Sequence, residues 1–485
     1  MNNSNKLSNS QIQTPLTTEK RTPLVEKCLG SEGGFPLVML RSYEPPQKVL
    51  DFIDTDTGEI LTLNPSLKDK LCTYRTLRYD LLDASREILF SFYGSNPPVN
   101  DKGYEVHHRT TTCSRYRFSK SVKVLKSQDH SKAFYGGLMR CADAKTCPVC
   151  SGVINERKAN EMRVAANQVE ALDLHMSMIT FTTPHVRTDA LDYILTGLNN
   201  AHADFWRGNP AKRFIEKFGI VGRVRSLEVR HGSNGWHPHF HIVIFSKIPL
   251  PFTKYSDNSN KFKKQPLPVD MQSSDWRFVL SRWQNMSLKH GLSKPNLFGM
   301  DIKNGVETGN YITKFGSDGD IKKTRSGKDI TWDLPDEMTK GNSKISKNSN
   351  SLSPWDFLHN FLDSELPANQ RKRYEALFIE YAKATKGLAL IRWSRGLRSI
   401  FGLSKKEKSD EEIINDEIDS AKTLCLIEPT EWRNILKSGD RTVLLELAEN
   451  GNIQAIANYL NISVEDLNSR NGSFVTNLIK TENSK

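Results

Sequence analysis

The sequence predicts an α+β fold, on two observations about its hydrophobic periodicity. First, His175–Thr183 alternates apolar and polar residues, which is the period of a strand. Further strands are expected at Val221–Arg230 and His239–Phe245, with a shorter one at Phe298–Lys303. Second, the segments between them repeat apolar residues at the spacing of a helix. The helical segments are Asn155–Leu172, Asp189–Trp206, Asp275–His290 and Gly305–Phe315.

The flanking elements follow from local signals. Phe52–Leu61 predicts a hairpin, because its DTDTGE string lacks the acidic twelfth position that a calcium loop needs. A helix is expected at Thr76–Phe92. His231–Gly235 supplies the Gly, Ser and Asn of a hairpin loop between two of the strands. Helices are expected again over Pro354–Thr385 and around Trp393–Phe401, and a small helical tail follows.

Composition shifts divide the chain into six regions. Lys-, Ser- and Asn-rich segments at 246–269 and 316–351 are expected to be exposed insertions. The regions are a disordered tail (1–23), an N-terminal accessory region (24–112), a Cys-rich module (113–152), a central domain (153–320), a helical and basic accessory region (321–403) and a C-terminal helical tail (404–485).

Length and charge narrow the class of protein. The 485 residues carry a formal net charge of +12, which favours a polyanionic partner, with nucleic acid first and an anionic membrane surface a distant second. No apolar run approaches the roughly 18–20 residues of a membrane span, and the first twenty residues lack a signal peptide's apolar core. We therefore expect a cytoplasmic protein without a membrane partner.

The string GWHPHFHIVIF at Gly235–Phe245 carries the strongest chemical signal. On a strand, His239 and His241 project to the same side, and two imidazoles at that spacing can bind one divalent cation. His237 is in phase as a further candidate ligand, and Glu228 on the partner strand could complete the site. Such ligands suit Mg²⁺ or Mn²⁺, and also Zn²⁺ or Co²⁺. The alternative is that these histidines are ordinary surface residues of a strand.

A second group lies in ETGNYITKF, from Glu307 to Phe315. On a helix, Glu307, Tyr311 and Lys314 share one face. A tyrosine can act as a nucleophile when a neighbouring base, lysine or metal offsets its pKa of about 10. The alternative is a solvated helix face with a partly buried ring.

Four cysteines, Cys113, Cys141, Cys147 and Cys150, form the third group. The CPVC string is half of a zinc knuckle, and Cys113 and Cys141 could complete a tetrahedral thiolate site. The histidines His107, His108 and His130 are possible substitutes for the fourth ligand. A redox CxxC pair is the competing interpretation, although the additional Cys141 favours structural zinc.

Basic and aromatic residues interleave in two further segments. Cys113–Lys126 contains Arg115 and Arg117, and Leu390–Arg398 contains Arg392, Trp393, Arg395 and Arg398. Arginines neutralise phosphates and aromatic rings stack on unpaired bases, so both segments are candidate DNA contacts. Core aromatics flanked by solvated charge would look the same.

Three motifs occur in the order found in a known protein family. They are the strand SMITFTT, the element HPHFH and the helix with Glu307, Tyr311 and Lys314. From about Cys113 to Phe401 the chain resembles the single-tyrosine rolling-circle replication initiators of small bacterial plasmids, in the HUH endonuclease superfamily. The Cys-rich block and the WSRGLR segment are also familiar in these proteins. The resemblance implies a central antiparallel sheet flanked by helices, with residues 153–320 as the HUH nicking domain.

The resemblance also implies a reaction. His239 and His241 would hold Mg²⁺ or Mn²⁺, with Glu228 as a third ligand. Tyr311 would attack one strand of single-stranded or hairpin origin DNA, forming a 5′-phosphotyrosine and a 3′-hydroxyl primer, with Lys314 positioning the phosphate or the metal. Glu307 would activate water for termination, unless strand transfer ends the cycle.

Other interpretations stay open at this stage. A transposase of the same superfamily shares the motif order, whereas relaxases usually place the tyrosine before the histidines. A non-catalytic zinc-ribbon regulator is the rival from a different class. A host helicase and DNA polymerase are the further partners expected of an initiator, and the sequence does not determine the oligomeric state.

Overall fold

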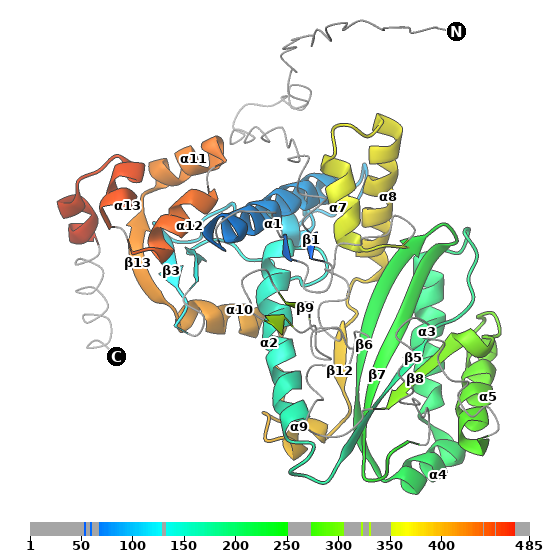
Figure 1. The fold of residues 1–485 in the computed structure, drawn as a ribbon. Coiled ribbons are helices and arrows are strands. Elements are labelled where there is room, and N and C mark those ends of the chain that lie inside the picture. The colour runs from blue at the N-terminus through cyan, green and yellow to red at the C-terminus, as the bar shows by residue number, and fades with distance from the viewer. Residues whose placement is uncertain are drawn as a thin grey trace, which may run out of the picture. The chain divides into compact units, whose positions relative to one another are not determined.

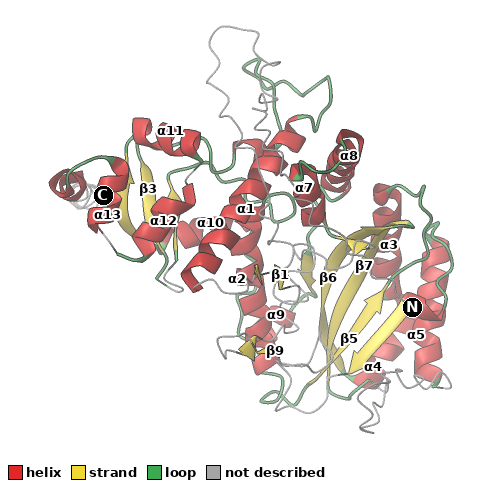
Figure 2. Ribbon diagram, turned by 45° about the horizontal axis from the view of Figure 1, so that its top comes forward, coloured by secondary structure: helices red, strands yellow, loops and turns green. Residues whose placement is uncertain are grey.

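The computed structural model describes six longer segments of the chain and four isolated strands of two residues each. The longer segments are residues 67–128, 132–250, 273–304, 351–439, 441–451 and 453–470. They form an α+β protein with antiparallel sheets and many helices, as predicted (Figure 2). Among the described helices, none is both long and apolar enough to span a membrane.

Figure 1 shows the elements in chain order. The strands are β1 (Ile53–Asp54), β2 (Glu59–Ile60), β3 (Val122–Lys126), β4 (Ala133–Gly136), β5 (His175–Phe181), β6 (Ile220–Gly232), β7 (Gly235–Ser246), β8 (Met300–Asn304), β9 (Lys322–Lys323), β10 (Asp329–Ile330), β11 (Ser351–Leu352), β12 (Ile391–Trp393) and β13 (Lys422–Ile427). The helices are α1 (Leu67–Phe90), α2 (Pro148–Asn167), α3 (Leu191–Phe205), α4 (Gly208–Phe218), α5 (Ser274–Lys289), α7 (Pro354–Leu362), α8 (Ala368–Ala384), α9 (Leu397–Ile400), α10 (Asp410–Asp419), α11 (Pro429–Ser438), α12 (Arg441–Glu449) and α13 (Ile453–Leu460).

The larger sheet has the strand order β11-β6-β7-β5-β8, and β12 also pairs with β6. All these pairs are antiparallel. The long hairpin β6–β7 turns at Ser233 and Asn234, so the predicted five-residue loop is tighter than expected. Gly235 follows the turn with a φ of +89°, in the region that only glycine adopts without strain. The predicted hairpin near residue 55 is also present, as β1 paired with β2.

Alternation along β7 gives the sheet two different faces. Phe240, Ile242 and Ile244 are buried in a core that includes residues of α3 and α5. Val243 and Phe245 point to the other face, into a smaller core with residues of α2 and α9. On that second face, His239 and His241 continue the same phase beyond the apolar residues. Along β7, this face therefore changes from apolar residues that helices cover, Val243 and Phe245, to the polar residues His239 and His241.

A second sheet, with the order β13-β3-β4, corrects the prediction of a purely helical C-terminal tail. Lys422–Ile427 forms β13, which pairs with β3 about 300 residues earlier in the chain. Both strands contribute to one core together with α1, α12 and the four cysteines. The strand that β13 pairs with is distant in sequence, which explains why the local helical pattern around β13 dominated the prediction.

Two smaller predictions also need correction. The segment around Trp393–Phe401 begins as strand β12, and only Leu397–Ile400 is helical. The helix expected from Asp189 starts at Leu191, while the Asp189 carboxylate accepts a hydrogen bond from the Val186 amide at 2.9 Å. Helix α4 was not predicted. It ends at Gly219, which adopts the left-handed conformation common after a helix.

Candidate functional site

The hairpin β6–β7 places one carboxylate and two imidazoles together. Glu228 lies directly opposite His239 in the strand register, and Ser226 lies opposite His241. Glu228 Oε2 is 2.8 Å from His239 Nε2 and 2.9 Å from His241 Nε2. The donor atoms of the three residues all lie within 4.8 Å of one another. The predicted group is therefore assembled by a single hairpin.

These spacings suit a metal ion of the Mg²⁺ or Mn²⁺ type. Donors at adjacent corners of an octahedron with bonds of about 2.1 Å are about 3.0 Å apart. The two short carboxylate–imidazole distances are close to that value. A carboxylate and imidazole nitrogens are also a donor set that several divalent ions accept, so the identity of the ion stays open.

Neighbouring side chains orient two of the three candidate ligands. Arg230 Nε donates a hydrogen bond to Glu228 Oε1 at 2.7 Å, which leaves Oε2 turned toward the imidazoles. Thr180 Oγ1 on β5 lies 3.1 Å from His241 Nδ1, which fixes the orientation of that ring. Burial raises the pKa of Glu228, but His239, His241 and Arg230 outweigh this and hold the pKa well below its usual range. The carboxylate is therefore ionised and ready to bind a cation.

His237 lies beside this group but has a different partner. Its Nε2 atom is 3.2 Å from Thr182 Oγ1, and its ring contacts the edge of His185 with centroids 4.9 Å apart. Burial and the neighbouring His239 and His185 lower the pKa of His237 to about 4. The compact three-residue group found among the described residues does not include it.

A cleft opens next to the three-residue group. It has a volume of about 550 Å³ and is lined by His237 and His239 together with Arg230 and the β6–β7 turn. Phe298 lies at this cleft and is 88% exposed. Because an exposed aromatic ring beside a cation site can stack on a base, the cleft is suited to a nucleotide chain. The sequence reasoning did not single out Phe298, Arg230 or Thr180.

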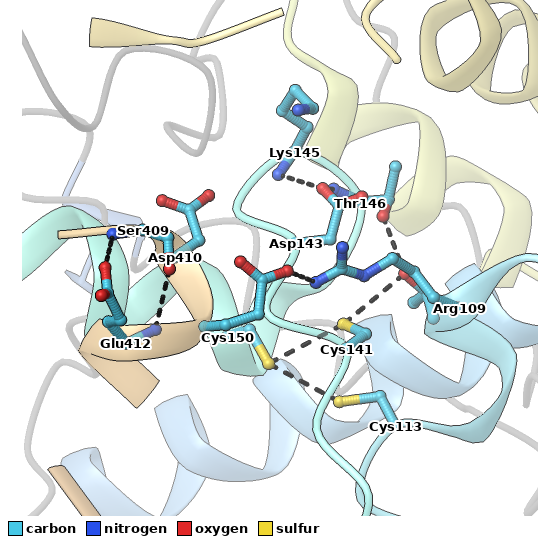
Figure 3. A network of polar contacts seen from close by, with 12 residues as sticks. Arg109, Cys113, Cys141, Asp143, Lys145, Thr146, Cys150, Ser409, Asp410 and Glu412 are labelled. Carbon is cyan, nitrogen blue, oxygen red and sulfur yellow. Dashed lines mark hydrogen bonds and ion pairs between the residues drawn. The ribbon is translucent and has the colours of Figure 1, made fainter. Parts of the chain in front are cut away.

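The four predicted cysteines also come together, and all are buried. Cys150 Sγ lies 3.6 Å from the sulfur of Cys113 and 3.8 Å from that of Cys141 (Figure 3). Cys113 Sγ also lies 3.6 Å from the sulfur of Cys147. A tetrahedron with zinc–sulfur bonds of about 2.3 Å has edges of about 3.8 Å. These separations are far longer than the roughly 2.05 Å of a disulfide. The four sulfurs therefore form a group that could hold a metal ion in tetrahedral geometry.

The sequence around CPVC explains half of this cluster. Cys147 is the N-cap of α2 and Pro148 occupies the first turn, where its missing N–H costs nothing. The Cys150 amide donates to Cys147 Sγ at 3.4 Å. Hydrogen bonds with the other three cysteines hold the pKa of Cys113 well below its usual range. His107 and His108 are not part of the four-residue group found among the described residues.

Three residues of the predicted reaction, Glu307, Tyr311 and Lys314, lie outside the described residues, and so does His130. Their roles stay predictions. The nearest described element before them is β8, whose last residue is Asn304. In the strand register, Asp301 on β8 is opposite Thr180 on β5, and Thr180 is opposite His241 on β7. The chain therefore enters the Glu307–Lys314 segment from a strand of the same sheet.

The basic segments differ in exposure. Arg117, Arg392 and Arg395 are exposed, and Arg115 and Trp393 are half-buried. Trp393, Arg395 and Arg398 line a second cleft of about 470 Å³. Arg398, however, is only 5% exposed. Its two terminal nitrogens donate to both carboxylate oxygens of Glu161 on α2 at 2.8 Å, which gives it a role in joining α9 to α2.

Comparisons with known proteins give two partial similarities. The chain is similar in part to a protein named Protein rep. That protein, from Streptomyces lividans, is 24% identical over 310 residues, which cover 55% of this chain and 64% of the relative. The Neomycin resistance protein of Streptomyces cyanogenus is 26% identical over 133 residues, which cover 22% of this chain and 30% of that relative. The chain thus spans less than two thirds of the length of Protein rep. No family model and no solved structure matches.

The Arg398–Glu161 pair gives a first testable prediction. Replacing Glu161 by glutamine is expected to lower the free energy of unfolding by about 3–5 kcal/mol, because a buried guanidinium loses its counter-charge. The matched control is Glu156→Gln on the same helix, because its pair with Arg163 is more accessible to solvent, with side chains 47% and 27% exposed, and should contribute about 0–1 kcal/mol. Urea unfolding of both variants measures the difference. Equal effects would contradict a structural role for Arg398.

Proposed function

We propose that this protein is a plasmid replication initiator of the HUH endonuclease type, which nicks one strand of origin DNA. The observation that carries the proposal is the convergence of Glu228, His239 and His241 on one hairpin, at a cleft with an exposed aromatic ring. The partial similarity to Protein rep supports a role in plasmid replication. The order of the histidines and Tyr311 in the sequence favours an initiator over a relaxase.

In the proposed reaction, the Tyr311 phenol oxygen attacks a phosphodiester phosphorus and loses its proton to a neighbouring base. The bond from phosphorus to the 3′ oxygen breaks and the leaving 3′ oxygen takes up a proton, which leaves a 5′-phosphotyrosine and a free 3′-hydroxyl. A divalent ion held by Glu228, His239 and His241 would supply a Lewis acid at the non-bridging oxygens. Arg230 and Thr180 keep the ligands oriented for that ion. A host polymerase and helicase would then extend the 3′-hydroxyl.

Two residues known from the sequence and one found in the structure complete the proposal. Lys314 would position the phosphate, and Glu307 would activate water for the terminating cleavage, unless strand transfer ends the cycle. Phe298 would stack on a base next to the scissile phosphate, since its ring is exposed at the cleft. The cysteine cluster would hold zinc in a structural role, because all four sulfurs are buried away from the cleft residues.

The decisive test is covalent attachment to DNA. Incubation of the protein with Mn²⁺ and a single-stranded origin oligonucleotide should give a covalent adduct on a denaturing gel. Tyr311→Phe removes only the phenol oxygen and should abolish the adduct, and mass spectrometry should locate the DNA on the peptide that contains Tyr311. DNA binding without an adduct, with any divalent metal, would favour the non-catalytic regulator instead.

A transposase of the same chemistry is distinguished by its products. An initiator should release unit-length circles from a plasmid that carries its origin, whereas a transposase should join the cut strand to a new target. Sequencing of the joined ends gives the answer.

A further inference from the structure

Three arginines gather on the sheet face opposite the Glu228–His239–His241 group. Arg223 and Arg225 lie two residues apart on β6, and Arg392 on β12 is directly opposite Arg225 in the register. The Arg225 guanidinium lies 4.1 Å from the centroid of the Phe240 ring. Phe240 belongs to the core on the α3 side of the sheet, so the arginines lie on that side too. We call Arg223, Arg225 and Arg392 the arginine cluster.

The surrounding side chains hold the cluster in a fixed arrangement. The Arg223 guanidinium stacks over Trp206 at 4.2 Å from the ring centroid. Arg225 Nη1 donates to Asn199 Oδ1 on α3 at 2.8 Å. Both planar groups are therefore positioned by aromatic rings and a neutral amide. Exposure increases outward from the buried Arg225, through the half-buried Arg223, to the exposed Arg392.

The cluster has no counter-charge among the described residues. No ion pair joins any of its three arginines to a carboxylate there, although other buried arginines, such as Arg398 and Arg441, are paired. Burial lowers the pKa values of Arg223 and Arg225 to about 10, so both side chains are still charged near neutral pH.

Three nitrogens around the cluster are also buried without a hydrogen-bond partner in the described part of the chain. They are Arg225 Nε, Trp206 Nε1 and His202 Nε2. Arg225 and Trp206 are only 6% and 8% exposed. Buried polar groups are nearly always paired in folded proteins, so a set of orphaned nitrogens beside unpaired cations points to a missing acceptor. An anion with several acceptor oxygens would satisfy the Arg225 and Trp206 nitrogens and balance the charge of the arginines.

We propose that the arginine cluster binds the phosphate backbone of DNA, at a second contact site on the face of the sheet opposite the metal-ligand group. A planar guanidinium can donate two parallel hydrogen bonds to phosphate oxygens. The three positive charges of the cluster would not be neutralised by a single carboxylate. An exposed Arg392 at the open end favours a long polyanion over a small enclosed ligand. This inference rests on the proposed function only in assuming that the protein binds DNA.

The test measures how DNA affinity depends on salt. Fluorescence anisotropy gives the dissociation constant for origin DNA, duplex and single-stranded, over a range of salt concentrations. The Arg223→Gln/Arg392→Gln double variant leaves the buried Arg225 in place and should lose two phosphate contacts. The slope of log affinity against log salt should then fall in magnitude by about 1.8 for duplex or about 1.4 for single-stranded DNA.

The matched control is Arg213→Gln/Arg433→Gln, which removes two exposed arginines from α4 and α11. Its slope should equal that of the wild type, and circular dichroism should show both double variants folded. A slope unchanged by the Arg223/Arg392 variant would overturn the inference. If the slope is unchanged and inorganic phosphate stabilises the wild type but not the variant, the cluster binds a small phosphate compound instead of DNA.

The nicking proposal is scored separately, by adduct formation in the wild-type protein. If the wild type forms no adduct but the slope falls as expected, the nicking proposal fails and the second DNA contact stands. If the adduct forms and the slope is unchanged, the nicking proposal stands and the second DNA contact fails.

Discussion

Replacement of Cys147 by serine is expected to release one zinc ion and to unfold the part of the protein built around β3, β4 and β13. All four cysteines belong to the core of that part, and Cys147 is fully buried. Structural zinc contributes about 10–16 kcal/mol of apparent binding free energy in small zinc modules, which is comparable to the whole stability of a domain. Even partial loss should lower the Tm by at least about 10 °C, since each kcal/mol shifts it by about 2–4 °C.

Elemental analysis of the purified protein and a thermal unfolding curve check this expectation. Cys425→Ser is the matched control, because Cys425 on β13 is equally buried in the same core but lies outside the four-sulfur group. It should keep one zinc ion per chain and lose far less stability. A Cys147→Ser protein that retains zinc and its Tm would show that the four sulfurs do not hold a metal. A strong chelator should reproduce the effect of Cys147→Ser on the wild type.

Replacement of His241 by alanine is expected to lower the rate of adduct formation by about 1000-fold. The variant removes one of three ligands, and the metal ion contributes several kcal/mol to phosphoryl-transfer chemistry, where about 1.4 kcal/mol is tenfold in rate. Thr180→Val should have a smaller effect, about 10–100-fold, because it removes only the partner that orients the His241 ring. In calorimetry with Mn²⁺, the affinity for the metal should be highest for the wild type, lower for Thr180→Val and lowest for His241→Ala.

His237→Ala is the comparison that makes this experiment specific. His237 lies two residues before His239 on the same strand but is bonded to Thr182. The variant should therefore keep its affinity for Mn²⁺. A loss as large as that of His241→Ala would mean that His237 is a metal ligand and that the three-residue group is incomplete.

Some of the site could be read from the sequence because its geometry is local. His239 and His241 are two residues apart on one strand, and the period of a strand alone places them on the same face. Glu228 was also accessible, because a hairpin with a short turn fixes which residues of its two strands are opposite each other. In CPVC, the proline and the two cysteines encode the start of α2 together with half of the cysteine cluster.

Other features depend on partners that no local pattern reveals. Thr180 comes from β5, about 60 residues before His241, and only the sheet order places the two side by side. Strand β13 pairs with β3 across nearly 300 residues, so its sequence neighbourhood gave the wrong expectation for the tail. Arg398 looked like a DNA contact in the sequence, but Glu161 on α2 is its partner in the fold.

The α+β class, the group Glu228, His239 and His241 and the CPVC half of the cysteine cluster could be predicted from the sequence, because each depends on a spacing within one or two adjacent elements. Which arginines are paired with a carboxylate depends on the tertiary structure. Arg398 and Arg392 look alike in the sequence, since both lie near Trp393 in the segment Leu390–Arg398, and the basic pattern of Arg223 and Arg225 does not show what they contact. The difference is that Arg398 meets a carboxylate from a distant helix, whereas Arg223, Arg225 and Arg392 converge from two strands on a described surface without one. Charge compensation is a property of three-dimensional neighbours, and sequence spacing does not encode it.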